Sequence, residues 1–377
     1  MARIRIASFN VENLFERPRA MSGQMREEGN PILDAHARIN ELFQAGTYTE
    51  AIRAQILDLL KTLGLLRSDE AQFAVLRQVR GRLVKRPAAP KPVEVVAGGR
   101  GDWIGWVDLV KDRVDELAMT NTARVITDVD ADIQAVVEAE SRIALKRFAD
   151  AGVLAGDGKP AYPHVMVIDG NDSRGIDVGL MTKGPHAIVD IVSHVDDADS
   201  AGRPVFSRDC PQYTVALASG RRIVLLVNHL KSKGYGTQAD NDALRGRQAR
   251  RVAAIYQQLR AAGQDDVVVL GDLNDTPDSA PLHPLLAGTD LQDVTVHPAF
   301  TSDGRPGTYA NGAKSQKIDY LLLSPHLFGQ VVGGAIFRKG VWGGVNGTLF
   351  PHYDTMTSPV HAASDHAALY ADLDLDA

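Results

Sequence analysis

The sequence predicts an α/β protein whose apolar strands end in polar residues. From about residue 125 onwards, short apolar runs typical of strands alternate with a segment of helical periodicity. The 377 residues are 44% hydrophobic, which suffices for one large α/β domain with an insertion or for two modest domains. We expect a single domain over residues 1–377, with an insertion over residues 17–125.

The first strand lies at the start of the chain, where Ile4, Ile6 and Ser8 alternate toward one face. This segment lacks the apolar core and cleavage site of a secretory signal, and no apolar run approaches the ~20 residues that cross a bilayer. Cys210 is the only cysteine, which excludes an internal disulfide and a cysteine-based zinc cluster. We therefore expect a cytoplasmic protein without a membrane partner.

Residues 17–125 differ from the rest of the chain and predict a mainly helical segment. Apolar side chains over residues 52–63 recur at helical spacing, and Thr49 is a suitable N-cap. A second helix is predicted from Ser68 to about Leu83, beyond which three prolines break the pattern.

The charge of the chain is mildly negative, with a formal net charge of -6. Residues 77–100 nevertheless contain seven Arg or Lys residues and a single acidic residue, Glu94. Such a run is more often a solvated surface than a binding site, but it is the best candidate in this chain for contact with a phosphate backbone. A polyanionic substrate is therefore neither required nor excluded by the net charge.

Beyond residue 125 the pattern predicts strands around one long helix. The helix begins at Asp240 or Asn241 and ends near Gly263. A turn of the hairpin type is expected at residues 219–221. The predicted strands cover residues 132–137, 213–218, 222–228, 267–270 and 318–323.

Polar side chains stand at the ends of these strands or next to them. A single Asp or Asn after a strand usually forms a turn, and a lone His there is usually a surface group. Six motifs that mix carboxylates, amides and histidines are harder to explain as turns, and they predict an active site. Their polar residues are Asn10, Glu138, Asn228, His229, Asp272, Asn274, Asp319, Ser364, Asp365 and His366.

These residue types supply what the hydrolysis of a phosphoester requires. A hard cation such as Mg²⁺ prefers carboxylate oxygens, and it polarises the phosphoryl group. A second carboxylate or an imidazole is needed to orient or deprotonate the attacking water. Neutral donors and a cationic histidine stabilise the negative charge of the transition state.

The order of the motifs resembles the endonuclease/exonuclease/phosphatase superfamily, which contains the pancreatic deoxyribonuclease and the abasic-site endonucleases. The resemblance covers residues 1–15 and about 125–375. It implies a two-sheet, four-layer α/β sandwich of the DNase I-like type, with helices outside and with the active site where loops of both sheets converge. The matching motifs are Ser8-Phe9-Asn10-Val11-Glu12-Asn13, Ala135-Val136-Val137-Glu138, Asn228-His229-Leu230-Lys231, Gly271-Asp272-Leu273-Asn274, Lys317-Ile318-Asp319-Tyr320 and Ser364-Asp365-His366.

The resemblance also implies a metal site for Mg²⁺ or Mn²⁺. Glu138 is expected to be the principal ligand, with Asn10 and Asp365 completing or supporting the metal shell. Val137 stands where the family normally has Gln, and Glu140 remains an alternative ligand on the same strand face. The long insertion suggests a bacterial branch of the superfamily.

The catalytic roles implied by the resemblance fall on five residues. Asp272 is expected to align or deprotonate the attacking water, and Asn274 to donate to the phosphoryl oxygens. His366 is expected to contact the scissile phosphate, with Asp319 fixing its tautomer. His229 is expected to be a second phosphate contact or the acid near the leaving group.

Two cationic residues are candidates for substrate binding. Arg174 precedes a probable strand in a region where the family often places a basic side chain near the phosphate, and a plain surface loop is the alternative. Lys231 is expected near the phosphate because it follows His229 closely. The arginines from Arg245 to Arg251 are expected to lie on an ordinary helix surface.

The leading hypothesis is a metal-dependent nuclease that hydrolyses phosphodiester bonds in DNA or RNA by in-line attack of water. The first alternative is a phosphatase or phosphodiesterase acting on a lipid, inositol or nucleotide phosphate. The second alternative is a non-catalytic nucleic-acid-binding module. That module requires an incomplete catalytic set, whereas every member of the set is present in this sequence.

Overall fold

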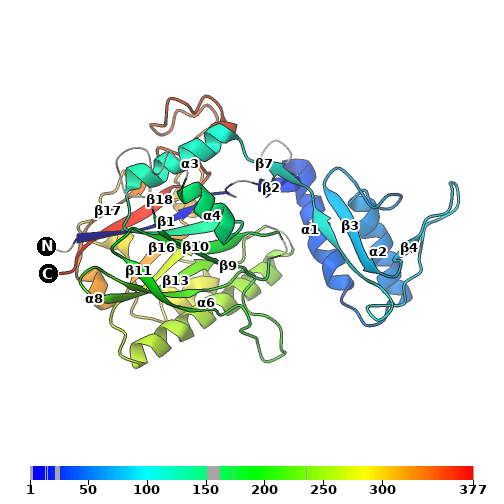
Figure 1. Ribbon diagram of the computed structural model, residues 1–377, viewed down its shortest axis with the longest axis horizontal. Coiled ribbons are helices and arrows are strands. Elements are labelled where there is room, and N and C mark those ends of the chain that lie inside the picture. The colour runs from blue at the N-terminus through cyan, green and yellow to red at the C-terminus, as the bar shows by residue number, and fades with distance from the viewer. Residues whose placement is uncertain are drawn as a thin grey trace. The chain divides into compact units, whose positions relative to one another are not determined.

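Figure 1 shows the computed structural model of the chain, which describes residues 3–12, 14, 16–21, 26–150, 162–172, 174–234 and 236–376. The motif residue Asn13 lies outside these residues. The chain forms two compact units. The larger unit comprises Met1–Phe15, Val114–Lys233 and Thr237–Ala377, and the smaller unit comprises Glu16–Arg113 and Gly234–Gly236. Among the described helices, none combines the length and the apolar character needed to cross a bilayer.

The first sheet of the larger unit has six strands in the order β17-β18-β1-β8-β10-β9. Strands β1 and β8 run parallel at its centre, and the other neighbours are antiparallel. The strands are β1 (Arg3–Asn10), β8 (Ile133–Ala139), β9 (His164–Ile168), β10 (Asp177–Thr182), β17 (Val331–Phe337) and β18 (Ala368–Asp374).

The second sheet also has six strands, in the order β11-β12-β13-β14-β16-β15. Strands β13 and β14 form its central parallel pair. Each sheet therefore has one parallel pair at its centre, whose carboxyl ends lie side by side. The strands are β11 (Ala187–Val192), β12 (Gln212–Ala216), β13 (Arg222–His229), β14 (Val267–Asp272), β15 (Gln292–Asp293) and β16 (Asp319–Leu323).

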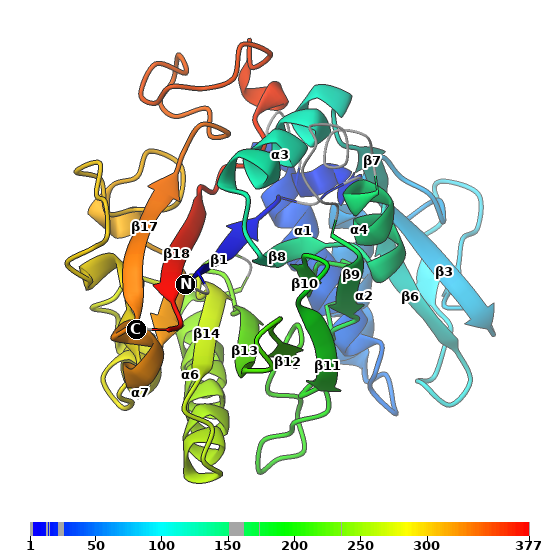
Figure 2. The same ribbon diagram turned by 60° about the vertical axis from the view of Figure 1, so that its left-hand side comes forward.

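The two sheets pack face to face through one apolar core. Ile6 and Leu180 of the first sheet and Leu225 and Leu321 of the second are completely buried in it. Helices α3 and α4 pack on the outer face of the first sheet, and α6 packs on the outer face of the second (Figure 2). These four layers confirm the predicted two-sheet DNase I-like sandwich. The helices of this unit are α3 (Glu116–Val129), α4 (Arg142–Ala149), α6 (Gln238–Ala261), α7 (His283–Leu286) and α8 (Pro325–Phe328).

The strands predicted beyond residue 125 are all present, with small differences at their ends. The long helix is also present, but its start is earlier than predicted. Thr237 is the N-cap, and its side chain accepts a hydrogen bond from the backbone N–H of Asp240. The predicted caps, Asp240 and Asn241, therefore lie inside the first turn, where an acidic residue favours the helix dipole.

In its described residues the smaller unit combines two α-helices with three antiparallel strand pairs, so the prediction of a mainly helical segment is wrong. The helix predicted around residues 52–63 is present, and Thr49 caps it by accepting a bond from Ile52 N–H. The strand pairs are β2–β7, β3–β6 and β4–β5. The elements are α1 (Arg26–Leu42), α2 (Glu50–Thr62), β2 (Glu16–Pro18), β3 (Ala74–Arg80), β4 (Val84–Lys85), β5 (Glu94–Val95), β6 (Ile104–Leu109) and β7 (Lys111–Arg113).

The second predicted helix, from Ser68 to Leu83, is absent, and Ala74–Arg80 within this segment form strand β3. Ala74 and Leu76 point into the core of the smaller unit, whereas the rest of the strand, Arg77 to Arg80, is exposed. The apolar residues of this short segment fit both a helical and an alternating period, and pairing with β6 decides the outcome.

Candidate active site

The parallel strand pairs place four of the predicted site residues at the same edge of the sandwich. Asn10 ends β1 beside Val137 of β8, one residue before Glu138. His229 ends β13 directly opposite Asp272, which ends β14. Because parallel strands share one carboxyl end, each sheet contributes two polar side chains at this edge.

A β-bulge turns Glu138 toward this edge. In the pairing of β8 with β10, Asp177 lies opposite Ala139 and Val178 lies opposite Val137, so Glu138 is an extra residue. Its φ of 70° lies in the left-handed region, which a non-glycine residue rarely adopts. Backbone strain of this kind is concentrated at functional sites.

The polar side chains of the two sheets meet in one buried cluster. The amide of Asn10 donates to Oε1 of Glu138 at 3.2 Å and to Oδ2 of Asp272 at 3.4 Å. Nε2 of His229 lies 3.7 Å from each of the same two carboxylates. Asn10 therefore bridges a carboxylate of the first sheet and a carboxylate of the second.

His366 and Asp319 form a second part of the cluster. Nδ1 of His366 donates to Oδ2 of Asp319 at 2.8 Å, and Thr308 donates its hydroxyl to the same oxygen at 2.6 Å. Nε2 of His366 then points toward Asp272 and Asp365, at 3.9 Å and 3.7 Å. The orientation of the imidazole is thus fixed by a carboxylate that is itself held in place.

The two histidines have opposite charge preferences. Burial lowers the pKa of His366, but the charge and hydrogen bond of Asp319 outweigh it and hold this pKa well above its usual value. Burial lowers the pKa of His229 well below its usual value, and the positive charges of Arg208 and Arg174 lower it further. His366 is therefore a cation at neutral pH, whereas His229 is neutral.

The turn after β14 orients Asp272. Its Oδ1 accepts the backbone N–H of Asn274 at 2.8 Å, which leaves Oδ2 facing Asn10 and the histidines. Asn274 has a φ of 57° and donates its side-chain amide to the carbonyl of Leu230 at 3.0 Å. Gly271 has a φ of 123°, and a Cβ there would lie 2.0 Å from the carbonyl oxygen of Asn228. Only glycine fits this position.

Asp365 lies at the rim of the cluster, with 32% of its side chain exposed. Its backbone N–H donates to Oε2 of Glu12 at 3.1 Å. The neighbouring Ser364 donates its hydroxyl to the carbonyl of Asn10 at 2.7 Å. The loop that carries His366 is thereby fastened to the end of β1, and Glu12 joins the site although no role was predicted for it.

The donor set fits a hard divalent cation. Burial raises the pKa of Glu138, and burial together with the charge of Asp319 raises the pKa of Asp272 to about 8. Ionised carboxylates in such a place need a nearby positive charge. Asp272, Asp319 and His366 also offer ligand atoms within 4.8 Å of one another. Because Asp319 and His366 bond each other, Glu138 and Asn10, with Asp272 beside them, are the better match for Mg²⁺ or Mn²⁺.

A cluster of cations lies beside these carboxylates and contains a residue that sequence reasoning missed. Arg208 is 3% exposed, and its Nε lies 3.0 Å from Oδ2 of Asp172. Arg174 binds the same carboxylate, at 2.6 Å. Burial and the charges of Arg208 and Arg174 lower the pKa of Lys231 to about 8. No motif distinguishes Arg208 in the sequence, since only the fold brings it near Glu138.

The expectation that Arg245 lies on a helix surface is wrong, because this side chain is completely buried. Its Nε donates to Asp275 at 2.9 Å, and its Nη1 donates to the carbonyl of Lys231 at 2.7 Å. One helix residue therefore ties the loop after His229 to the loop after Asp272.

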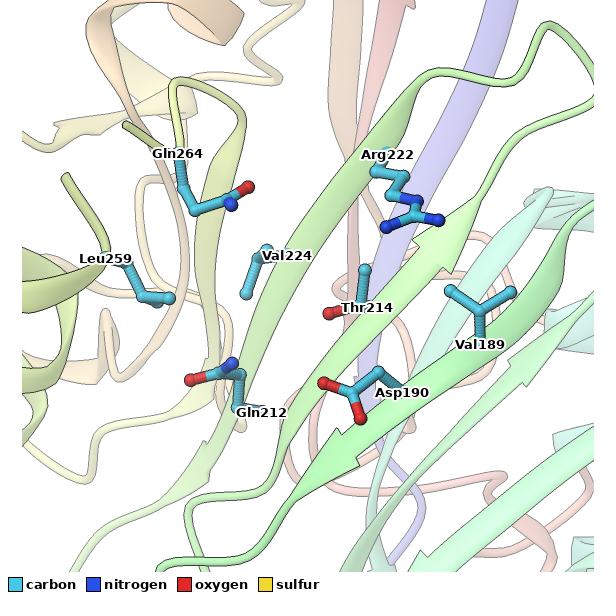
Figure 3. Close-up of a pocket in the computed structure, with 8 residues that line it drawn as sticks. All are labelled: Val189, Asp190, Gln212, Thr214, Arg222, Val224, Leu259 and Gln264. Atoms are coloured by element: carbon cyan, nitrogen blue, oxygen red, sulfur yellow. The ribbon is translucent and has the colours of Figure 1, made fainter. Parts of the chain in front are cut away.

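A pocket of about 310 Å³ lies elsewhere, on the outer face of the second sheet (Figure 3). Its walls come from β11, β12, β13 and the end of α6, and the charged side chains Asp190 and Arg222 are on the sheet side (Figure 3). Arg222 begins β13, whereas His229 ends it, so the pocket is remote from the clustered carboxylates. Among the described residues, its lining contains one carboxylate, Asp190, and no imidazole, whereas phosphoester hydrolysis at a metal site needs several such groups.

The family model described as "Endonuclease/Exonuclease/phosphatase family" matches residues 94–331. Among solved structures, an endonuclease/exonuclease/phosphatase family protein from Bacteroides thetaiotaomicron is 17% identical, covers 68% of this chain and 87% of that chain, and has a TM-score of 0.50. A mannosyl-6-phosphatase from the same species is 16% identical, with coverage of 68% and 90% and a TM-score of 0.50. These structures share the fold. A search of curated proteins returned no match.

Proposed function

Because the chain belongs to the endonuclease/exonuclease/phosphatase family, a group of phosphoesterases, we propose that it is a metal-dependent nuclease that hydrolyses phosphodiester bonds in DNA or RNA. The observation that carries the chemistry is the convergence of Asn10, Glu138, Asp272 and His366 at one edge of the sandwich. Mg²⁺ or Mn²⁺ is the proposed cofactor, held by Glu138 with Asn10 and supported by Asp365.

The geometry of the side chains supports the following roles. A bound divalent cation supplies positive charge that polarises the phosphoryl group. Oδ2 of Asp272 faces the centre of the cluster, where this residue orients the attacking water and accepts its proton. The cationic His366 donates from Nε2 to a phosphoryl oxygen, because its Nδ1 is committed to Asp319. The neutral His229 is a hydrogen-bond partner of the phosphate and a poor proton donor.

The charge distribution supports nucleic acid as the substrate. Lys231, Arg174 and Arg208 provide positive charge next to the catalytic carboxylates. Residues 16–113 contain 16 Lys or Arg and 13 Asp or Glu, whereas the rest of the chain contains 25 and 34. The smaller unit is thus basic in an acidic protein, as expected of a unit that contacts a phosphate backbone.

A phosphatase acting on a small phosphate ester is the second candidate, and one observation favours it. Arg174 and Arg208 share Asp172, with Lys231 near them, so up to three cations can surround one phosphate. Such an arrangement also suits the dianion of a terminal phosphate.

A substrate panel separates the two candidates. Purified protein with Mg²⁺ or Mn²⁺ is incubated with single-stranded DNA, RNA, duplex DNA, a phosphate monoester and a small phosphodiester. We expect cleavage of at least one nucleic acid, and its loss in EDTA and in Asp272→Asn. Asp190 is an exposed carboxylate of the remote pocket, and Asp190→Asn is the control that should keep full activity. Phosphate release from the monoester without cleavage of any nucleic acid would overturn the proposal in favour of the phosphatase.

A further inference from the structure

The outward face of the strand pair β3–β6 in the smaller unit carries an exposed tryptophan between arginines. The register pairs Arg77 with Trp106 and Arg80 with Ile104, so these four side chains lie on the same face. Figure 2 shows β3 and β6 as neighbouring strands. Trp106 is 43% exposed, and Val79, the extra residue of a bulge in β3, is 68% exposed.

The exposure of Trp106 stands out against its neighbour Trp103. Trp103 is completely buried, packs against Phe43 with ring centroids 4.6 Å apart, and donates its indole N–H to Gln78 at 3.1 Å. The burial and packing of Trp103 are those of a core residue, whereas Trp106 exposes a large aromatic surface to solvent. An aromatic residue left exposed next to arginines is typical of a binding surface.

The planar groups on this face are held in place before any ligand arrives. Asp108 accepts the indole N–H of Trp106 at 2.6 Å and Nε of Arg77 at 2.9 Å. One carboxylate thus fixes an indole and a guanidinium side by side. Because both side chains are already ordered, they lose less conformational entropy when a ligand stacks on them.

The charges around this face are suited to an anion. Arg82 closely follows β3 and is exposed, as are Lys85 and Lys91 further along the chain. Among the described residues no ion pair is formed by these three, although Glu94 lies opposite Lys85 in the β4–β5 pair. They belong to the run at residues 77–100, where seven cationic residues accompany one acidic residue. The combination of stacking groups and unpaired cations matches a polyanion that carries exposed aromatic rings.

We propose that the outward face of β3–β6 is a binding platform for single-stranded nucleic acid. A base stacks on Trp106, and Arg77, Arg80 and Arg82 contact the phosphates beside it. A single strand fits better than a duplex, because the bases of a duplex already stack on one another and hide their faces. The inference deepens the proposed nuclease function and rests on it, since it names the strand state of the substrate.

Binding is measured by the fluorescence anisotropy of a labelled single-stranded oligonucleotide, with the full chain in EDTA so that the probe stays intact. Trp106→Ala should weaken binding about tenfold or more, and Trp106→Phe should restore most of the loss. Arg82→Ala should reduce the salt dependence of the affinity by about one counterion, whereas Arg222→Ala, an exposed arginine of the larger unit, should not. Equal affinity of Trp106→Ala and the unmodified protein overturns the platform.

A second measurement separates this inference from the proposed function. The rate of hydrolysis of a small phosphodiester in Mg²⁺ should be the same for Trp106→Ala and the unmodified protein, whereas kcat/KM for the oligonucleotide falls in the variant. Cleavage of nucleic acid that is insensitive to Trp106 overturns the platform alone. Failure of the unmodified protein to bind or cleave any oligonucleotide overturns both. Stronger binding of duplex than of single strands contradicts the strand preference.

Discussion

Nδ1 of His366 lies 2.8 Å from Oδ2 of Asp319, and both side chains are buried. Thr308 donates its hydroxyl to the same oxygen, so Oδ2 of Asp319 accepts two hydrogen bonds and is held in place. The pair sets the charge of His366 and directs its Nε2 toward Asp272. The protonation state of His366 therefore depends on Asp319, which need not touch the substrate.

Asp319→Asn should lower the pKa of His366, because burial, which lowers this pKa, remains while the charge that raises it most is removed. With less imidazolium at neutral pH, kcat should fall by about 100-fold or more. The alkaline limb of the pH–rate profile should also move to lower pH. The profile is recorded from about pH 6 to about pH 10, which extends above the usual range of a histidine because Asp319 raises the pKa of His366. An unchanged limb shows that His366 does not act as a cation.

Glu138→Gln should abolish metal binding without harming the metal-free fold. Burial raises the pKa of Glu138, so its ionised form opposes folding once the pH rises through its folded pKa. The neutral Gln removes that cost and still accepts from Asn10. The melting temperature without metal should therefore stay equal or rise, and Mg²⁺ should raise it only in the unmodified protein. Loss of the fold in Glu138→Gln assigns this residue a structural role instead.

The gain in melting temperature from Mg²⁺ should itself increase with pH. Burial and Asp319 raise the pKa of Asp272 to about 8, so protons compete with the cation below that pH. In the metal-free protein, the stability linked to this raised pKa is present at acidic pH and is lost as the pH approaches 8. Thermal melts with and without Mg²⁺ across this range test the competition, and a gain independent of pH contradicts it.

Substrate affinity should decline above about pH 8 because Lys231 loses its charge there. Burial lowers its pKa, and the charges of Arg208 and Arg174 add to the effect. KM should rise above this pH while kcat changes less, because Lys231 binds the phosphate in both the ground state and the transition state. Lys231→Arg should move the rise in KM to higher pH, since arginine keeps its proton.

Arg245→Met should lower the free energy of unfolding by about 1.5–3 kcal/mol, because it removes one of two cations that bind the buried Asp275 and leaves Lys233. It should also lower kcat, since the loops after His229 and Asp272 lose their common anchor. Denaturant unfolding and kinetics at saturating substrate measure both effects. Arg250→Met, an exposed arginine of the same helix, is the matched control and should change neither quantity.

The strands of the larger unit were predicted well because they are continuous apolar runs that burial on both faces requires, whereas the two-sheet sandwich was implied by the family resemblance of the motifs. Val267–Leu270 is an example, and it forms most of β14. The segment from Ser68 to Leu83 was misread because its apolar spacing fits two periods, and only the long-range pairing with β6 selects the strand.

The sequence predicted the clustering of polar residues that lie at the end of a strand, such as Glu138 and Asp272. The remaining parts of the site depend on tertiary structure. The bulge that turns Glu138 is defined by its pairing with β10. Arg208 and Arg245 resemble ordinary surface arginines in the sequence, because nothing local shows that folding will bury them against Asp172 and Asp275.

The measurement that tests the central claim most directly is the nicking of supercoiled plasmid and the cleavage of single-stranded oligonucleotides in Mg²⁺ or Mn²⁺. EDTA and His366→Ala accompany the unmodified protein. We expect cleavage by the unmodified protein and its loss in both controls, because the cation and the imidazolium act on the same phosphate. Cleavage that persists in His366→Ala, or its absence from every nucleic acid tested while small phosphoesters are hydrolysed, contradicts the account.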